Sequence, residues 1–177
     1  MLKRYYSRRS FFRRVMGMMA LGLARAQGAP WPQGMELEVA FAYQGGGFRY
    51  RAPYVACYVE DERGNLVRTL ALFLMPGKGE RWWNELRRYF LQSTPERMRT
   101  LSGPTRPPGR YRVVWDGKDE AGRPVAQGRY HICVEYAREH GPYELFREAV
   151  EIGPKPFKKA YTLKGELSEV ALDYRKA

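Results

Sequence analysis

Every second position from residue 35 to residue 43 holds a large apolar side chain, with glutamate or alanine between them. This period of two places the large side chains on one face of a β-strand. Further strands are expected within 55–59, 66–74, 111–115, 130–136, 145–152 and 170–174. Residues 62–65 (Glu-Arg-Gly-Asn) predict a hairpin turn between the second strand and the third. Short strands in this number predict an all-β protein, an immunoglobulin-like β-sandwich of about seven to eight strands.

One segment, residues 81–92, departs from the period of two. Its apolar residues are spaced three and four apart, which predicts one short amphipathic helix inserted between strands. These residues are Trp82, Trp83, Leu86, Tyr89 and Phe90. A loop containing four prolines is expected to follow at residues 93–110. The tryptophans either close one open end of the sandwich, or Trp82 or Trp83 stacks on a planar ligand whose anionic group the nearby arginines neutralise.

The first 26 residues have the composition of an export signal. Twin arginines stand before two phenylalanines, which is the address that the twin-arginine translocase reads. The apolar run at residues 15–24 is about half as long as a membrane span, and small residues suited to cleavage follow it. The signature residues are Ser7, Arg8, Arg9, Phe11, Phe12, Ala24 and Ala26. We expect a twin-arginine signal peptide at 1–26 and a periplasmic location; the alternative is a basic arm that stays on the protein.

The remaining residues, 27–177, have the size of a single domain, whose core is expected at about 35–174. The leader holds seven of the 31 basic residues and none of the 19 acidic ones, so its removal lowers the net charge from +12 to +5. Residues 80–112 hold eight arginines against three glutamates, which accounts for this remaining excess. An exported protein of such modest charge is not expected to bind nucleic acid.

A charged turn is expected after the strand at residues 130–136. Arg138, Glu139 and His140 stand before Gly141. This group indicates either a turn held by an ion pair or a small polar site. No serine, histidine and acid arrangement with a nucleophile signature occurs in the sequence, and no carboxylate pair is placed for acid–base work, so we do not expect an enzyme.

A second charged turn gathers carboxylates that offer oxygen ligands to calcium. They are Asp116, Asp119 and Glu120. Lys118 lies among them, and the regular alternation of oxygen ligands in a calcium loop is missing. The alternative interpretation is a solvated hairpin turn.

The two cysteines, Cys57 and Cys133, lie on predicted strands that can belong to different sheets of the sandwich. Alternation places Cys57 inward, but it places Cys133 on the opposite face of its strand from Ile132. A disulfide needs both side chains on one layer, so the pattern favours free thiols without excluding a bridge. A metal site that combines His131, Cys133 and His140 has no recognised ligand spacing.

Two hairpins resemble the immunoglobulin-like domain of the flagellar hook-capping protein. The similar residues are 59–70, 115–125 and 128–130. In both hairpins the turn residues supply the backbone angles that the turn requires. This similarity supports the fold and says little about function.

A closer resemblance is to the predicted periplasmic family called domain of unknown function 2271. It depends on Ser-Gly-Pro-Thr-Arg-Pro-Pro-Gly at residues 102–109, on the hairpin that begins at Trp115, and on Ala-Arg-Glu-His-Gly at residues 137–141. The resemblance covers roughly residues 35–174. It implies an exported protein without an established activity that occurs with flavin transferases and PepSY-type membrane redox proteins.

The same resemblance implies a covalent flavin site. The segment that starts at Ser102 is similar to the motif in which a flavin transferase esterifies FMN to a threonine hydroxyl, and the matching threonine is Thr105. The phosphate would then lie near Arg106 or Arg110. Pro104 stands where that motif usually has alanine, and proline fixes φ and removes a backbone donor.

We therefore expect an exported, non-catalytic accessory or binding protein of a periplasmic redox or membrane-associated assembly. The alternative is an electron carrier with FMN attached at Thr105. In either case the partner is expected in the cell envelope, as a PepSY-type membrane redox protein or a flavin transferase.

Overall fold

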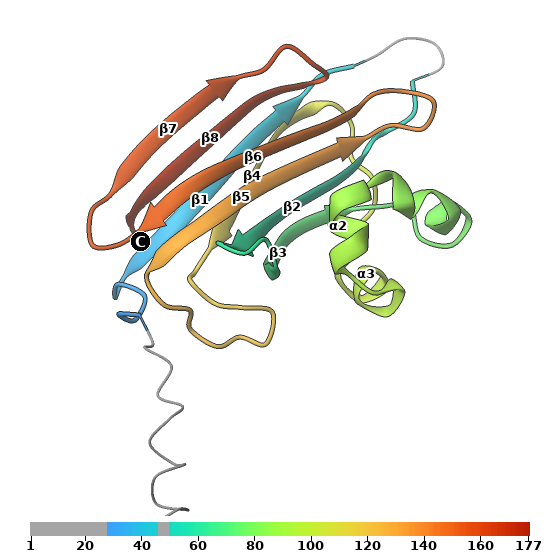
Figure 1. Cartoon of the computed structure of the whole chain (residues 1–177). Coiled ribbons are helices and arrows are strands. Elements are labelled where there is room, and N and C mark those ends of the chain that lie inside the picture. Colours follow the sequence, from blue (N-terminus) through green and yellow to red (C-terminus); the bar gives the residue numbers. More distant parts are fainter. Residues whose placement is uncertain (1–27, 46–49) are drawn as a thin grey trace, which may run out of the picture.

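The computed structural model describes residues 28–45 and 50–177, and within them eight strands form two antiparallel four-stranded sheets (Figure 1). The β1 sheet has the order β4-β1-β8-β7, and the β2 sheet has the order β3-β2-β5-β6. The strands are β1 (Met35–Tyr43), β2 (Tyr54–Asp61), β3 (Leu66–Phe73), β4 (Gly109–Trp115), β5 (Gly128–Ala137), β6 (Tyr143–Ile152), β7 (Phe157–Thr162) and β8 (Leu167–Lys176). The predicted all-β sandwich is confirmed. The export signal predicted at 1–26 lies outside the described residues.

The space between the sheets holds the side chains that alternation places inward. The five large apolar residues of β1 are all buried in this core. At one end of the core Trp115 meets Trp31 and Tyr130 edge to face, with ring centroids 4.8 and 5.1 Å apart. Such aromatic pairs add to the apolar area that the sheets bury. The alternation seen in the sequence therefore fixes which face of β1 meets the β2 sheet.

The hairpin turn predicted at residues 62–65 joins β2 to β3. The Asp61 amide donates to the Asn65 carbonyl at 2.9 Å, and Gly64 has a φ of +84°, a value that favours glycine. The Asp61 carboxylate in turn accepts from the backbone N–H and the side-chain amide of Asn65, both at 2.8 Å. The turn is thus held by its own side chains.

One strand was not predicted. β7 pairs only with β8, at the edge of the β1 sheet, and its side chains alternate between half-buried and exposed. Lys159 interrupts the apolar alternation because it stands on the half-buried face, between Phe157 and Tyr161. Lysines on an edge strand discourage pairing with other chains. The total of eight strands lies within the predicted range.

The prediction of one helix at residues 81–92 followed by a loop at 93–110 is wrong in two respects. The chain forms a 3₁₀ helix η1 (Gly77–Glu85), then α2 (Arg87–Gln92) and α3 (Pro95–Leu101). Leu86 separates the first two because its ψ of +72° is not helical. Inside the expected loop, the Thr94 hydroxyl accepts from the Arg97 amide and Pro95 occupies the first turn of α3, which are ordinary helix-start features.

These three segments, the helical layer, cover the outer face of the β2 sheet and do not close an open end of the sandwich (Figure 1). A second apolar core lies between the layer and the sheet. The layer contributes Trp83, Leu86, Tyr89 and Met98 to it, and the sheet contributes Tyr54, Ala56, Tyr58, Leu72 and Cys133. Trp83 is buried there and is closed to a stacking ligand, whereas Trp82 stays half-buried.

Candidate functional site

The segment with the flavin-site resemblance runs along the edge of the β2 sheet on its way from α3 to β4. The Gly103 amide donates to the Leu72 carbonyl at 2.8 Å, and the Leu74 amide donates to the Gly103 carbonyl at 2.9 Å. The Ser102 hydroxyl faces back to α3, where it donates to the Arg99 carbonyl at 3.4 Å. The beginning of the motif is therefore bonded to β3 and α3, and the part that starts at Pro104 is not.

Thr105 is half-buried, between exposed Pro104 and exposed Arg106. The Arg106 guanidinium lies 5.0 Å from the ring centre of Phe73 and 5.9 Å from that of Tyr111, and the Tyr43 hydroxyl donates to the Arg106 carbonyl at 3.1 Å. Burial raises the pKa of Tyr43, so this hydroxyl stays protonated and can donate. The residue that follows Thr105 thus places its guanidinium near two aromatic rings.

The other residues expected near the flavin have different partners. Arg110 on β4 forms an ion pair with Glu169 on β8, across β1, which lies between these two strands. Trp82 meets the ring of His140 edge to face, 6.2 Å between centroids, beside the hairpin that joins β5 to β6. Ser102, Thr105 and Arg106 lie in one five-residue segment, where Ser102 contacts α3 and Arg106 contacts Phe73 and Tyr111. Arg110 and Trp82 have other contacts.

The charged residues of the turn after β5 pair mainly with residues of other segments. Arg138 donates to the Glu166 carboxylate at 2.6 and 2.8 Å, while Glu139 pairs with Arg51 at 3.2 Å. Hydrogen bonds from Arg138 hold the pKa of Glu166 below its usual value. His140 has a φ of +56° and an exposed side chain. The turn is thus tied to two distant segments, and its histidine faces solvent.

The carboxylates of the turn after β4 are occupied by donors of the chain itself. Asp119 accepts from the amides of Ala121 and Arg123, each at 2.9 Å, and hydrogen bonds from Arg123 lead the causes that lower its pKa. Asp116 pairs with Lys118 at 2.8 Å. Among the described residues, no group of three or more His, Cys, Asp or Glu side chains is arranged to hold a metal ion.

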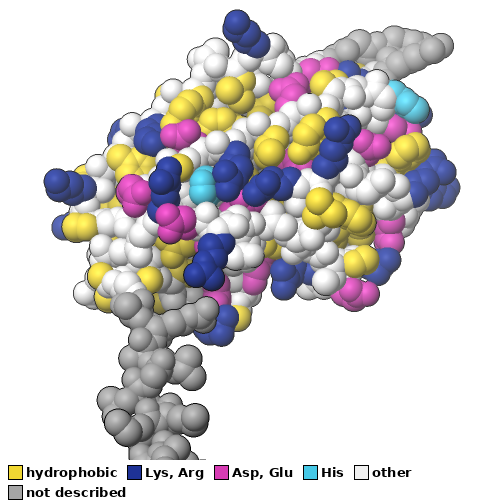
Figure 2. All heavy atoms as spheres, viewed as in Figure 1, with side chains coloured by type: hydrophobic (Ala, Val, Ile, Leu, Met, Phe, Trp, Pro, Cys, Tyr) yellow, Lys and Arg dark blue, Asp and Glu magenta, His cyan; other side chains and the backbone are white. Residues whose placement is uncertain are grey.

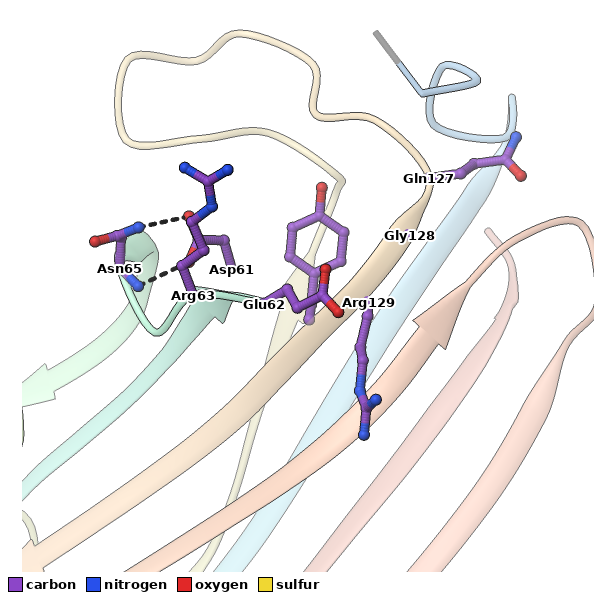
Figure 3. Close-up of a pocket in the computed structure, with 8 residues that line it drawn as sticks. Asp61, Glu62, Arg63, Asn65, Gln127, Gly128 and Arg129 are labelled. Carbon is purple, nitrogen blue, oxygen red and sulfur yellow. Dashed lines mark hydrogen bonds between the residues drawn. The ribbon is translucent and has the colours of Figure 1, made fainter. Parts of the chain in front are cut away.

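A polar groove lies at the end of the sandwich where the β2–β3 turn faces the segment from β4 to β5 (Figure 3). It consists of two adjoining hollows of about 410 and 460 Å³ that share Asp61 and Tyr130. The first is also lined by Glu62, Arg63, Asn65, Gln127, Gly128 and Arg129. The second also contains Arg97 of α3 and residues Asp119, Glu120 and Arg123 of the β4–β5 segment. We call this feature the end groove.

Two glutamates that were not predicted as site residues have side chains completely buried beneath the helical layer. Glu60 accepts two hydrogen bonds from Arg88, at 2.6 and 2.9 Å, and one each from Gln92 and Arg147. Burial alone would raise the pKa of Glu60, but the hydrogen bonds from Arg88, Gln92 and Arg147 hold it below the usual value. A charged carboxylate therefore fastens α2 to both β2 and β6.

Glu135 fills the same role for the start of α2. Its carboxylate accepts from the backbone amides of Arg88 and Tyr89 at 2.8 and 2.9 Å. The hydroxyls of Tyr58 and Tyr143 donate to it at 3.1 and 3.0 Å. Negative charge at the first turn of a helix is favourable because the amides there lack partners within the helix. The one signal in the sequence is that β2 and β5 are apolar on both faces around these glutamates.

The two cysteines are both free and buried, and they belong to the same sheet, so the placement in two sheets is wrong. Cys57 lies opposite Val134, and Cys133 lies opposite Tyr58, on neighbouring strands. Cys57 faces the core between the sheets and Cys133 faces the core beneath the helical layer. This agrees with the opposite orientations that alternation predicts.

Together these observations define a two-sheet β-sandwich with a helical layer on one outer face and a polar groove at one end. A family model described as "Predicted periplasmic protein (DUF2271)" matches residues 36–169, and the chain belongs to this family. No curated protein and no solved structure matches the chain. In the part of the chain that the structure describes, every helix is too short or too polar to cross a membrane. The similarity to the hook-capping domain stays an expectation.

Proposed function

We propose that this periplasmic family member is a non-catalytic accessory protein that holds a cell-envelope partner in the end groove. The observation that carries the proposal is the charge distribution there. Asp61 and Asp119, inside the groove, are satisfied by the chain's own donors, whereas Arg63, Arg129 and Glu62 are exposed on the rim. A groove whose inner carboxylates are already occupied suits recognition through its rim charges, two of them cations, better than acid–base chemistry.

The walls of the groove are held in place by contacts across it, which favours binding without rearrangement. The Glu120 carboxylate accepts from the Thr69 amide at 2.8 Å, and Arg68 donates to the Asp119 carbonyl at 2.9 Å. The Trp115 indole donates to the Lys118 carbonyl at 2.9 Å. These bonds connect the β4–β5 segment to β3 and to the main core, so the groove has a defined shape before a partner arrives.

Site-specific photo-crosslinking in the native cell tests this role. A photoreactive phenylalanine at Arg63 or Arg123 is expected to give a discrete, light-dependent adduct in the envelope fraction. The matched control carries the same residue at Thr162, which is exposed on β7. The double substitution Arg63→Glu with Arg129→Glu should abolish the adduct formed at position 123. Equal adducts from the groove and from position 162, or none from the groove, would contradict the proposal.

A second candidate function, a flavin-carrying electron-transfer protein, is supported by the setting of Thr105. Its backbone is outside regular structure and the residue is half-exposed. The guanidinium of the next residue, Arg106, lies near the aromatic rings of Phe73 and Tyr111. In this proposal a flavin transferase joins the threonine oxygen to the FMN phosphate of FAD, and AMP leaves with the proton taken from the hydroxyl. The bound flavin would supply one- and two-electron transfer, and Arg106 would lie near the phosphate.

Co-expression with a flavin transferase tests the second candidate. The expected result is an intact mass raised by FMN less one water and a flavin absorbance band, both lost in Thr105→Val. Thr100→Val on α3 is the matched control and should remain modified. Pro104→Ala should increase the modified fraction, because it restores a backbone donor to the part of the motif that is not bonded to β3. An unmodified mass in both the wild type and Pro104→Ala would rule out attachment at Thr105.

A further inference from the structure

Cations, a tryptophan and an exposed leucine gather on the helical layer beside the β5–β6 hairpin. The Arg81 guanidinium lies 5.1 Å from the ring centre of Trp82, which itself meets His140. The Arg87 guanidinium lies 4.5 Å from the ring centre of Tyr143. The Arg81–Trp82 pair and the Arg87–Tyr143 pair are neighbours because His140, which Trp82 contacts, and Tyr143 belong to the same hairpin. We call this surface the hairpin patch; it comprises Arg81, Trp82, Arg87, Leu91, His140 and Tyr143.

Leu91 extends the patch along α2. It follows Arg87 by four positions, so both side chains lie on the outward face of the helix. Its side chain is 85% exposed, the largest value among the large hydrophobic residues that are exposed in the described chain. Figure 2 shows hydrophobic side chains over the helical layer with Lys and Arg side chains around them. Exposure of such a large apolar side chain to water is unfavourable, and contact with another apolar phase would lower its free energy.

The cations of the patch have no carboxylate partner among the described residues, unlike two other arginines of the layer. Arg88 is paired with Glu60 and Arg99 with Glu80, but Arg81 and Arg87 form no ion pair there. Residues 77–101 hold six basic and three acidic residues, and one of the six, Lys78, is exposed and near Arg81 in sequence. The nearest acid of the hairpin, Glu139, is paired with Arg51. The patch therefore presents a net positive charge to any partner.

We infer that the hairpin patch docks the protein on the surface of an anionic phospholipid bilayer. Arg81 and Arg87 lie against lipid phosphates, Trp82 lies at the headgroup level, and Leu91 enters the boundary of the acyl chains. Basic residues, tryptophan and leucine are the composition of surfaces that lie in a membrane interface. Leu91 projects outward, and a lipid surface accepts a projecting side chain without a matching pocket, which favours lipid over a protein partner.

Co-sedimentation with vesicles tests this inference, using the protein as recovered from the periplasm. We expect binding to phosphatidylcholine vesicles that contain phosphatidylglycerol and little binding to phosphatidylcholine alone. Arg81→Gln with Arg87→Gln should weaken binding about 25-fold, since each cation near an anionic surface contributes about fivefold. Leu91→Gln should weaken it about tenfold. The matched control is Arg112→Gln with Lys155→Gln, which removes the same charge from exposed positions away from the patch.

Near-ultraviolet circular dichroism of each variant serves as the folding control. Equal loss of binding in the patch and control variants would show attraction through net charge alone and would overturn the inference. Binding that is unchanged in Leu91→Gln, or equal on vesicles with and without phosphatidylglycerol, would also overturn it. A failure here leaves the end groove untouched, because none of its lining residues belongs to the patch.

Discussion

The two sheets of the sandwich differ in what lies on their outer faces. The helical layer covers the β2 sheet and buries Glu60 and Glu135, whereas no layer formed by residues 28–45 or 50–177 covers the outer face of the β1 sheet. Across that uncovered face Ala40 lies opposite Ala171, which lies opposite Ala160. Ion pairs flank the alanines; Glu38, for example, pairs with Arg175 at 3.0 Å.

This difference shows that the contribution of an outward-facing glutamate to stability depends on whether another layer covers it. Glu38 keeps 22% of its side chain exposed and pairs with an arginine in contact with water, an arrangement that contributes little to stability. Glu135 has no contact with water and accepts four hydrogen bonds instead. A buried carboxylate is tolerated only when it has such a complete set of donors, and removing the carboxylate leaves all of these donors without an acceptor.

The largest expected effect follows from removing Glu135. Glu135→Leu leaves two backbone amides and two tyrosine hydroxyls without an acceptor, so the free energy of unfolding should fall by about 3 to 5 kcal/mol. Glu38→Leu on the open face should change it by about 0 to 1 kcal/mol. Urea denaturation followed by circular dichroism measures both. Similar losses in the two variants would remove the distinction between the faces.

A second contrast uses apolar side chains. Met98 anchors α3 in the core beneath the helical layer and is fully buried. Met98→Ala should lower the free energy of unfolding by about 2 to 4 kcal/mol, because it removes buried area and leaves a cavity. Val114→Ala, on the exposed surface of β4, should stay within about 0.5 kcal/mol. Urea denaturation measures both variants. A small loss of unfolding free energy in Met98→Ala would mean that the helical layer is loosely attached.

The buried ion pairs of the layer make its stability dependent on pH. The pKa of folded Glu60 lies below its unfolded value, so its contribution is complete above about pH 4.3 and is lost as the pH falls toward the folded pKa. Glu60→Gln should cost about 1 to 3 kcal/mol at neutral pH. It should also flatten the decline of stability between neutral and acidic pH, measured by urea denaturation across that range. A slope equal to that of the wild type would show that other carboxylates cause the decline.

The smallest effect is expected at Leu91, within the covered half but on its outer surface. Leu91→Gln should change the free energy of unfolding by no more than about 0.5 kcal/mol, because the side chain is already in water. Thermal unfolding checks this directly. A large destabilisation would mean that Leu91 packs within the layer and is not available to a membrane.

The sandwich could be predicted because strands such as β1 and β8 bury mainly one face, and alternation reports that directly, although β2 and β5 bury both faces. The helices were harder. Leu86 interrupts the helix with a local bend that apolar spacing does not reveal, and the prolines after residue 92 suggested a loop. Thr94 and Pro95 are residues typical of a helix start, so the beginning of α3 can be predicted from the sequence.

The buried carboxylates could not be predicted from alternation. A glutamate at an outward position, such as Glu60 or Glu135, is assigned to solvent unless something is known to cover that face. The cover is a tertiary feature, formed by residues 28 and 32 positions away for Glu60 and 46 and 47 positions away for Glu135. The end groove was missed for the same reason, since turns distant in sequence form its walls.

The back-to-back cysteines give the protein a means of reporting which of its two cores opens. Burial raises the pKa of the Cys133 thiol to about 12 and raises that of Cys57 as well, so neither reacts while its core is closed. Cys133 becomes accessible to an alkylating reagent when the helical layer lifts, and Cys57 only when the sheets part. The order in which the two thiols are labelled therefore reads out, without any added probe, whether the covered face is the first part of the molecule to unfold.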